Sequence, residues 1–96
     1  MTSKQRAYLK GLAMNIEPVF QIGKSSVGPE LTDAVSECLK KREIVKLNVL
    51  KNCADDPKDI ASVIAERTKS VVVQVIGRKI VLYKRNNENP KIELPK

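Results

Sequence analysis

The stretch from residue 19 to residue 42 constrains the fold most, because it predicts a strand that passes into a helix through a tight turn. Pro18 excludes helix at its own position, and the apolar residues after it predict a short strand over residues 19–22. Pro29 suits the first turn of a helix, which we predict over residues 29–42. Its apolar residues have the spacing of a core-facing stripe: Leu31, Ala34, Val35, Cys38 and Leu39.

The remaining elements follow from apolar periodicity and from capping residues. We predict a helix over residues 3–14 with Ser3 as its N-cap, and a strand over 44–50. Asp56 is the predicted N-cap of a third helix that runs to about Lys69. The runs 71–76 and 80–83 predict a hairpin whose turn, 77–79, opens with a glycine at positive φ. After residue 85 the tail is expected to be irregular, with Ile92 and Leu94 docking back onto the fold.

The predicted order is therefore α-β-α-β-α-β-β, within one domain that spans residues 1–96. It implies the α/β (α+β) class, with a mixed four-stranded sheet and helices packed on it. The length of 96 residues is enough for one hydrophobic core and leaves no room for a separate catalytic lobe.

Positive charge is concentrated toward the two ends of the chain. The formal charge is +7, from 18 Lys and Arg against 11 Asp and Glu. Residues 1–24 carry a net +3, residues 25–76 carry none, and residues 77–96 carry +4. If the fold brings both ends together around the turn at residues 23–26, a one-sided basic patch results. Such a patch attracts polyanions, of which nucleic acid is the first candidate.

Several classes of function are disfavoured by what the chain contains. It has no histidine and only two cysteines, which do not form a C-x-x-C pair, so a metal site is not expected. No paired carboxylates suggest an active site, and we expect neither enzymatic activity nor a cofactor nor a small-molecule substrate. No apolar run resembles a signal peptide or a membrane span, so we expect a cytoplasmic protein with no membrane partner.

The turn Gly23-Lys24-Ser25-Ser26 is the best candidate site. Backbone N–H groups, two hydroxyls and an ammonium at a helix N-terminus are suited to holding phosphate. A nucleotide-binding P-loop is excluded, because the glycine that this motif requires five residues before Gly23 is here Pro18. Two interpretations remain open: a purely structural turn, and a grip on a nucleic-acid backbone of the kind that KH modules make.

Further basic residues are candidates for phosphate contacts beside this turn. They come from the first helix and from the hairpin turn: Lys4, Arg6, Lys10, Arg78 and Lys79. The three on the helix lie off its apolar stripe, toward water. The chain has only three aromatic rings, at Tyr8, Phe20 and Tyr83, so base-by-base stacking on single strands is disfavoured. Recognition of the backbone and shape of a folded RNA fits better.

Several blocks in the right order give the chain a specific resemblance to a known family. They are residues 4–13 (KQRAYLKGLA), 22–24 (IGK), 43–46 (EIVK), 73–78 (VQVIGR), 81–83 (VLY) and 91–95 (KIELP). The chain resembles the YhbY-type proteins, the stand-alone bacterial form of the CRM (chloroplast RNA splicing and ribosome maturation) domain. The family's loop is usually Gly-x-x-Gly, whereas Ser26 occupies the fourth position here. Ser26 is therefore expected to adopt a backbone conformation that glycine takes more cheaply.

The resemblance implies an RNA-binding module whose fold is similar to the C-terminal domain of the bacterial translation initiation factor that acts on the small subunit. It further implies association with ribosomal RNA in precursors of the large ribosomal subunit, and hence a role as a ribosome assembly factor. The alternative is a protein-interaction adaptor that docks on an acidic partner through the same basic patch.

Overall fold

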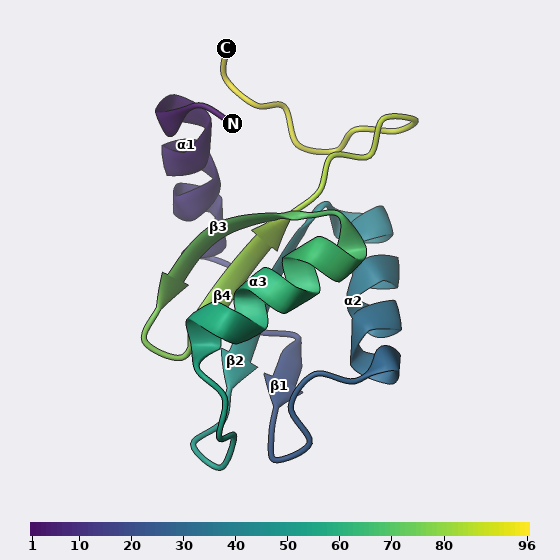
Figure 1. Cartoon of the computed structure of the whole chain (residues 1–96). Coiled ribbons are helices and arrows are strands. Elements are labelled where there is room, and N and C mark those ends of the chain that lie inside the picture. The colour runs from purple at the N-terminus through teal and green to yellow at the C-terminus, as the bar shows by residue number, and fades with distance from the viewer.

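The elements occur in the predicted order α-β-α-β-α-β-β. The computed structural model describes residues 1–96 and forms one α+β domain (Figure 1). Its elements are α1 (Ser3–Ala13), β1 (Phe20–Ile22), α2 (Pro29–Arg42), β2 (Ile44–Val49), α3 (Pro57–Thr68), β3 (Val71–Ile76) and β4 (Lys79–Tyr83). Most of these bounds lie within one residue of the predicted ones. No helix is long and apolar enough to span a bilayer.

The four strands form one mixed sheet in the order β1-β2-β4-β3. β1 is parallel to β2, while β4 is antiparallel to both of its neighbours, β2 and β3. Three strands, β1, β2 and β3, therefore run in the same direction. The connections that follow them emerge at the same end of the molecule, which is the lower end in Figure 1. We call this end the loop end.

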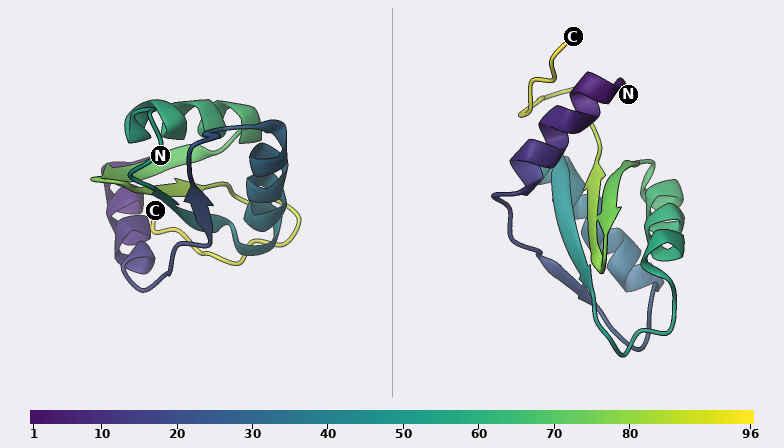
Figure 2. Two further views of the ribbon diagram at one scale, coloured as in Figure 1. Left: turned by 90° about the horizontal axis from the view of Figure 1, so that it is seen from below. Right: turned by 90° about the vertical axis from the view of Figure 1, so that its left-hand side faces the viewer.

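Helices cover both faces of the sheet, so the core has two parts (Figure 2). On one face, α2 and α3 pack on β2 and β4 around the larger cluster of buried residues. β2 contributes Val45, Leu47 and Val49 to this cluster, the three residues that a period of two places on one face. On the other face, α1 covers a smaller cluster that includes Leu9, Val81 and others.

The first helix begins one residue earlier than its predicted cap implies, because Thr2 and not Ser3 is the N-cap. The Thr2 hydroxyl accepts a hydrogen bond of 3.1 Å from the Gln5 N–H, and the Gln5 side chain accepts one of 3.1 Å from the Thr2 N–H. This capping box requires a glutamine or glutamate three residues after the cap, and only Thr2 meets that condition. At α3 the predicted cap is confirmed, since Asp56 accepts from the Lys58 N–H at 2.8 Å.

The hairpin turn is one residue shorter than predicted, because Lys79 already pairs with Ile76 in the sheet. Gly77, with φ of 57°, and Arg78 form a two-residue loop in which only the first residue has positive φ, as in a II′ turn. A bulge lies within the hairpin, where the register shifts between Val72 and Gln74. The predicted positive φ of Gly77 is confirmed.

The C-terminal tail is anchored by a buried carboxylate. Glu43 ends α2 with φ of 64° and is fully buried. Its side chain accepts hydrogen bonds from the N–H groups of Asn86 at 2.8 Å, Ile92 at 2.7 Å and Lys91. Burial by itself raises the pKa of Glu43, but these three donors and Arg85 outweigh it, and the net pKa is lowered. Beyond the anchor, Ile92 and Leu94 pack against the cluster under α1, as predicted.

Candidate nucleic-acid interface

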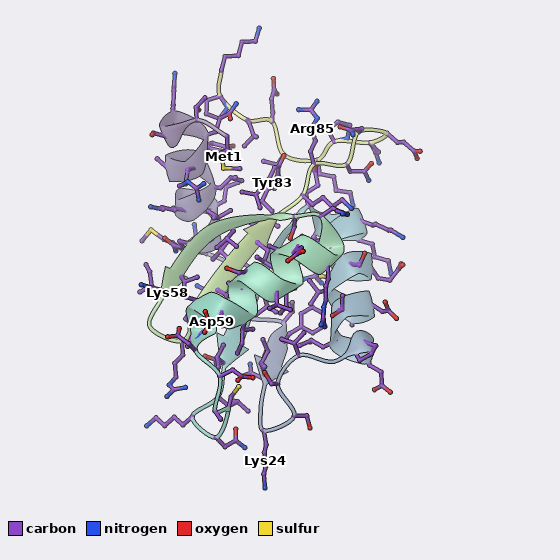
Figure 3. The ribbon with its side chains drawn as sticks, viewed as in Figure 1. Met1, Lys24, Lys58, Asp59, Tyr83 and Arg85 are labelled. Atoms are coloured by element: carbon purple, nitrogen blue, oxygen red, sulfur yellow. The ribbon has the colours of Figure 1, made fainter.

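The candidate loop is a tight turn at the end of β1. The N–H of Ser26 donates to the carbonyl oxygen of Gly23 at 2.9 Å, which closes a turn around Lys24 and Ser25. Lys24 is exposed and projects from the loop end into solvent (Figure 3). The turn therefore presents an exposed ammonium group at its tip, and the hydrogen bond between Ser26 and Gly23 fixes the path of the backbone beneath it.

Ser26 lies in the left-handed region, with φ of 54°. This confirms the conformation expected for the position where the family usually has glycine. Only two other residues besides glycine share this feature, Glu43 and Lys69, and both end helices. Ser26 is therefore the one case that a helix C-terminus does not explain, and it turns the chain from β1 toward α2.

Several backbone donors around the turn have no acceptor within the protein. Gly28 is the N-cap of α2, and no side chain caps this helix. Pro29 has no N–H, and the first backbone bond of the helix runs from Thr32 to Gly28 at 3.0 Å. The residues whose N–H groups make no hydrogen bond are Gly23, Lys24, Ser25, Val27, Gly28, Glu30 and Leu31. Together with the positive end of the helix dipole, such donors favour an anion.

The parallel strands bring other cationic residues to the same end. The hairpin turn packs beside the end of β2: the Arg78 guanidinium donates to the Leu50 carbonyl oxygen at 3.1 Å. Lys79 pairs with Asn48 on the neighbouring strand β2, and its ammonium group donates to the Asn48 side chain at 2.8 Å. The connection after β2 adds Lys51, and it lies beside the turn, since a Cβ on Gly23 would sit 3.6 Å from Asn52.

Sequence reasoning missed Lys51, which follows β2. The signal that could have found it is the strand order. Once β1, β2 and β3 are known to run in parallel, the residues that follow each strand must meet at one edge of the sheet. The same reasoning places Arg78 and Lys79 near the turn, as the sequence analysis expected.

The basic patch was predicted on the condition that both ends of the chain meet around the turn, and α1 and the C-terminal tail do not lie there. α1 and the tail lie together at the end of the molecule opposite the turn, and the longest dimension is 39 Å (Figures 1 and 2). The physical reason is the Glu43 anchor, which ties the tail beside α1. Lys4 and Lys10 are exposed on α1, so they form a separate basic region and remain predicted phosphate contacts.

Arg6 does not point toward water as expected. Its guanidinium donates to the carbonyl oxygens of Val72 at 2.6 Å and Val73 at 2.8 Å. These two carbonyls belong to the bulge in β3, where the regular pairing of the hairpin is interrupted. Arg6 is half-buried and ties α1 to an edge strand, so the donors of its Nη1 are already used within the fold.

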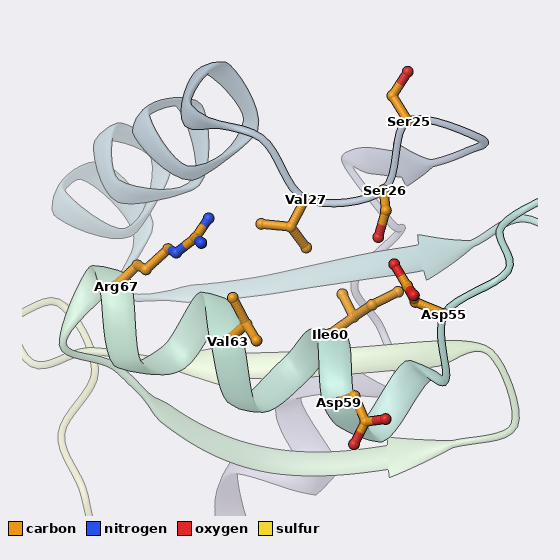
Figure 4. Close-up of a pocket in the computed structure, with 8 residues that line it drawn as sticks. All are labelled: Ser25, Ser26, Val27, Asp55, Asp59, Ile60, Val63 and Arg67. Carbon is orange, nitrogen blue, oxygen red and sulfur yellow. The ribbon is translucent and has the colours of Figure 1, made fainter.

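Acidic residues also lie at the loop end. Asp55 and Asp59 line a cleft of about 420 Å³ between the turn and α3, together with Ser25, Ser26 and Val27 from the other side. Figure 4 shows this cleft, with the Asp55 carboxylate directed toward Ser26. No group of three histidine, cysteine, aspartate or glutamate side chains is arranged to hold a metal ion.

Comparison with known proteins agrees with this architecture. The family model of the CRS1 / YhbY (CRM) domain matches residues 1–84. The probable RNA-binding protein YqeI of Bacillus subtilis is 41% identical over 95 residues, which cover 99% of each chain. An RNA-binding protein of Haemophilus influenzae is 32% identical over 96 residues, covering 100% of this chain and 96% of the relative.

Among solved structures, a hypothetical protein of Staphylococcus aureus, described as a candidate RNA-binding protein, has the same fold. It matches with a TM-score of 0.82 and 45% identity, over 99% of each chain. The matched family model, the two relatives and this structure agree with one another over nearly the whole length. The chain belongs to the CRS1/YhbY (CRM) domain family.

Proposed function

We propose that this protein binds RNA, and that the turn at residues 23–26 holds the RNA backbone. The observation that carries the proposal is the combination of unpaired N–H donors with Lys24 at the same helix start. Lys51, Arg78 and Lys79 surround this site on loops and strand ends of the same edge. Relatives of the family that are named as RNA-binding proteins support the choice of RNA over other polyanions.

Contacts of this kind position a nucleic acid without reading its sequence. Backbone N–H groups and lysine bind phosphate oxygens, which every nucleotide carries. Stacking platforms are missing at the loop end: Phe20 packs against the larger core, Tyr83 is buried, and Tyr8 lies on α1. Base-by-base recognition of a long single strand is therefore disfavoured. A folded RNA can present phosphates of different segments to basic regions that lie at the two ends of the domain.

The RNA that we propose is ribosomal RNA in precursors of the large ribosomal subunit, with the protein acting as a cytoplasmic assembly factor. The support for this finer assignment is membership of the YhbY-type family, which implies it. A binding role without chemistry fits the absence of histidine and of any metal-binding cluster near the turn. The Lys24 turn and the α1 region would then contact RNA segments at the two ends of the domain.

Cross-linking in living cells, followed by sequencing of the attached RNA, tests the assignment. We expect cross-links concentrated in the RNA of the large subunit, and enriched in gradient fractions that contain incomplete subunits. Cross-links spread over messenger RNA, or confined to the small subunit, would contradict it.

A nuclease-treated lysate separates RNA binding from the adaptor alternative. An RNA-binding protein leaves its complex when the RNA is digested, and we expect this outcome. A protein adaptor that docks on an acidic partner stays in its complex, and that result would contradict RNA as the ligand.

A further inference from the structure

The cleft beside the Lys24 turn is an open hollow lined by both apolar and polar residues. Its volume of about 420 Å³ falls in the range of about 300–1,000 Å³ that small-molecule sites have. Val27 lies on the side of the turn, and Ile60 and Val63 on α3 face it (Figure 4). Val63 is exposed although it is apolar, so a flat apolar group that enters the cleft would bury surface that the protein itself leaves open.

Asp55 lines this cleft, and its side chain makes no hydrogen bond or ion pair that stabilises the fold. Its neighbour Asp56 caps α3, but no hydrogen bond or ion pair involves Asp55. Figure 4 shows its carboxylate pointing toward Ser26, whereas the carboxylate of Asp59, which also lines the cleft, is directed away from Ser26. Asp55 is exposed, so its two carboxylate oxygens are open to the cleft and to solvent, with no donor from the protein.

A carboxylate beside a phosphate-binding turn needs an explanation, because it repels the phosphates that the turn attracts. The repulsion is offset if a hydrogen-bond donor of the bound nucleotide meets the carboxylate. Among the bases, guanine presents two donors side by side, the N1–H and the N2 amino group, which match the two oxygens of a carboxylate. Uracil presents a single N3–H between two carbonyl oxygens, and those oxygens would face the negative charge.

We infer that the cleft between the turn and α3 holds one unpaired guanine of the bound RNA, with Asp55 accepting hydrogen bonds from its Watson–Crick edge. The inference rests on the proposed RNA binding and adds sequence discrimination to it. The phosphate of this nucleotide lies on the turn, and the base lies between Val27 and Val63. Base edges that are splayed out of a helix are the usual targets of sequence-specific RNA recognition.

The groove continues past the cleft along the gap between α2 and α3. A second hollow shares Val27 and Arg67 with the first and extends to Pro29, Thr32 and Asp33 on α2. Arg67 is exposed and makes no hydrogen bond or ion pair within the protein. Its guanidinium is placed to receive the phosphate that follows the bound base.

The test uses RNA hairpins that differ in one unpaired nucleotide: guanosine, inosine or uridine. Inosine keeps the N1–H and lacks the N2 amino group. We expect the wild-type protein to bind the guanosine hairpin about tenfold more tightly than the uridine hairpin, with inosine in between. In Asp55→Asn this preference should fall to less than about twofold. Glu66→Gln, which removes the same charge from an exposed position on α3, should keep it.

Two results would overturn the inference. One is equal affinity of the wild-type protein for the three hairpins. The other is an Asp55→Asn protein that binds all three more tightly by the same factor, which would show that Asp55 only repels phosphate.

Lys24→Ala separates this inference from the proposed function. It should weaken binding of all three hairpins equally while the guanine preference remains. Wild-type protein that binds no hairpin at all would contradict RNA binding itself, and the guanine site with it.

Discussion

The N–H of Ser26 donates a 2.9 Å hydrogen bond to the carbonyl oxygen of Gly23, and this bond places Lys24 at the tip of the turn. The chain can make the bond and still enter α2 because Ser26 takes a φ of 54°. The geometry of one residue therefore couples the strand that precedes the turn to the helix that follows it. It also determines which backbone N–H groups face outward.

Ser26→Gly should be neutral or stabilise the protein by up to about 1 kcal/mol. Glycine adopts positive φ without steric cost, although this gain is partly offset by its greater freedom in the unfolded chain. Ser26→Val should cost about 1–2 kcal/mol, because a β-branched residue fits the left-handed region poorly. Urea unfolding of the three proteins measures the order, and a valine variant as stable as the wild type would contradict the geometry of the turn.

Arg6→Met should destabilise the fold by about 1–3 kcal/mol. Methionine keeps the helix propensity and most of the packing, but it leaves the carbonyl oxygens of Val72 and Val73 without their donor. Lys10→Met on the same helix is the control, since Lys10 is exposed and should change stability by less than about 0.5 kcal/mol. Equal unfolding midpoints for both variants would show that the Arg6 contacts contribute nothing.

Glu43→Gln should destabilise the protein by about 2–3 kcal/mol at neutral pH, because an amide accepts weaker hydrogen bonds than a carboxylate. The folded-state pKa of Glu43 is lowered, so the stability that its charge contributes is present above the unfolded pKa. It is lost as the pH falls through the lower folded pKa. The difference between wild type and variant should thus be constant near neutral pH and shrink below about pH 4.

Hydrogen exchange at the N–H groups of Lys91 and Ile92 gives a second measure of the same anchor. Both should exchange faster in Glu43→Gln, while Glu37→Gln, an exposed change on α2, should leave them unaffected. Unchanged protection in Glu43→Gln would contradict the anchor.

The element order, the start of α2 at Pro29 and the Asp56 cap of α3 could be predicted, because each depends on residues close together in the sequence. The left-handed Ser26 was expected from the resemblance to a family whose loop is usually Gly-x-x-Gly. Pro29 and the stripe from Leu31 to Leu39 predict α2 without information from the rest of the chain. The glycine at Gly77 likewise marks its own turn.

The arrangement of the charges could not be predicted, because it depends on contacts between distant residues. Glu43 binds amides 43 to 49 positions later, and its burial has no signature in the local pattern. Arg6 has the spacing of a solvent-facing residue, yet the bulge in β3 creates two acceptors that it reaches. The spacing of apolar residues predicts neither the bulge nor the strand order. The cleft beside Asp55 depends on the strand order, so it could not be predicted either.

The most direct test of the account is the salt dependence of binding to a structured fragment of large-subunit ribosomal RNA. Wild type, Lys24→Ala and Lys41→Ala are compared, because Lys41 is exposed in the last turn of α2 at the opposite end from the turn. We predict that Lys24→Ala weakens binding and reduces the slope of log affinity against log salt by about 0.7–0.9, the contribution of one phosphate. Lys41→Ala should leave both nearly unchanged. Unchanged affinity and slope in Lys24→Ala would contradict the assignment of the turn as the RNA contact.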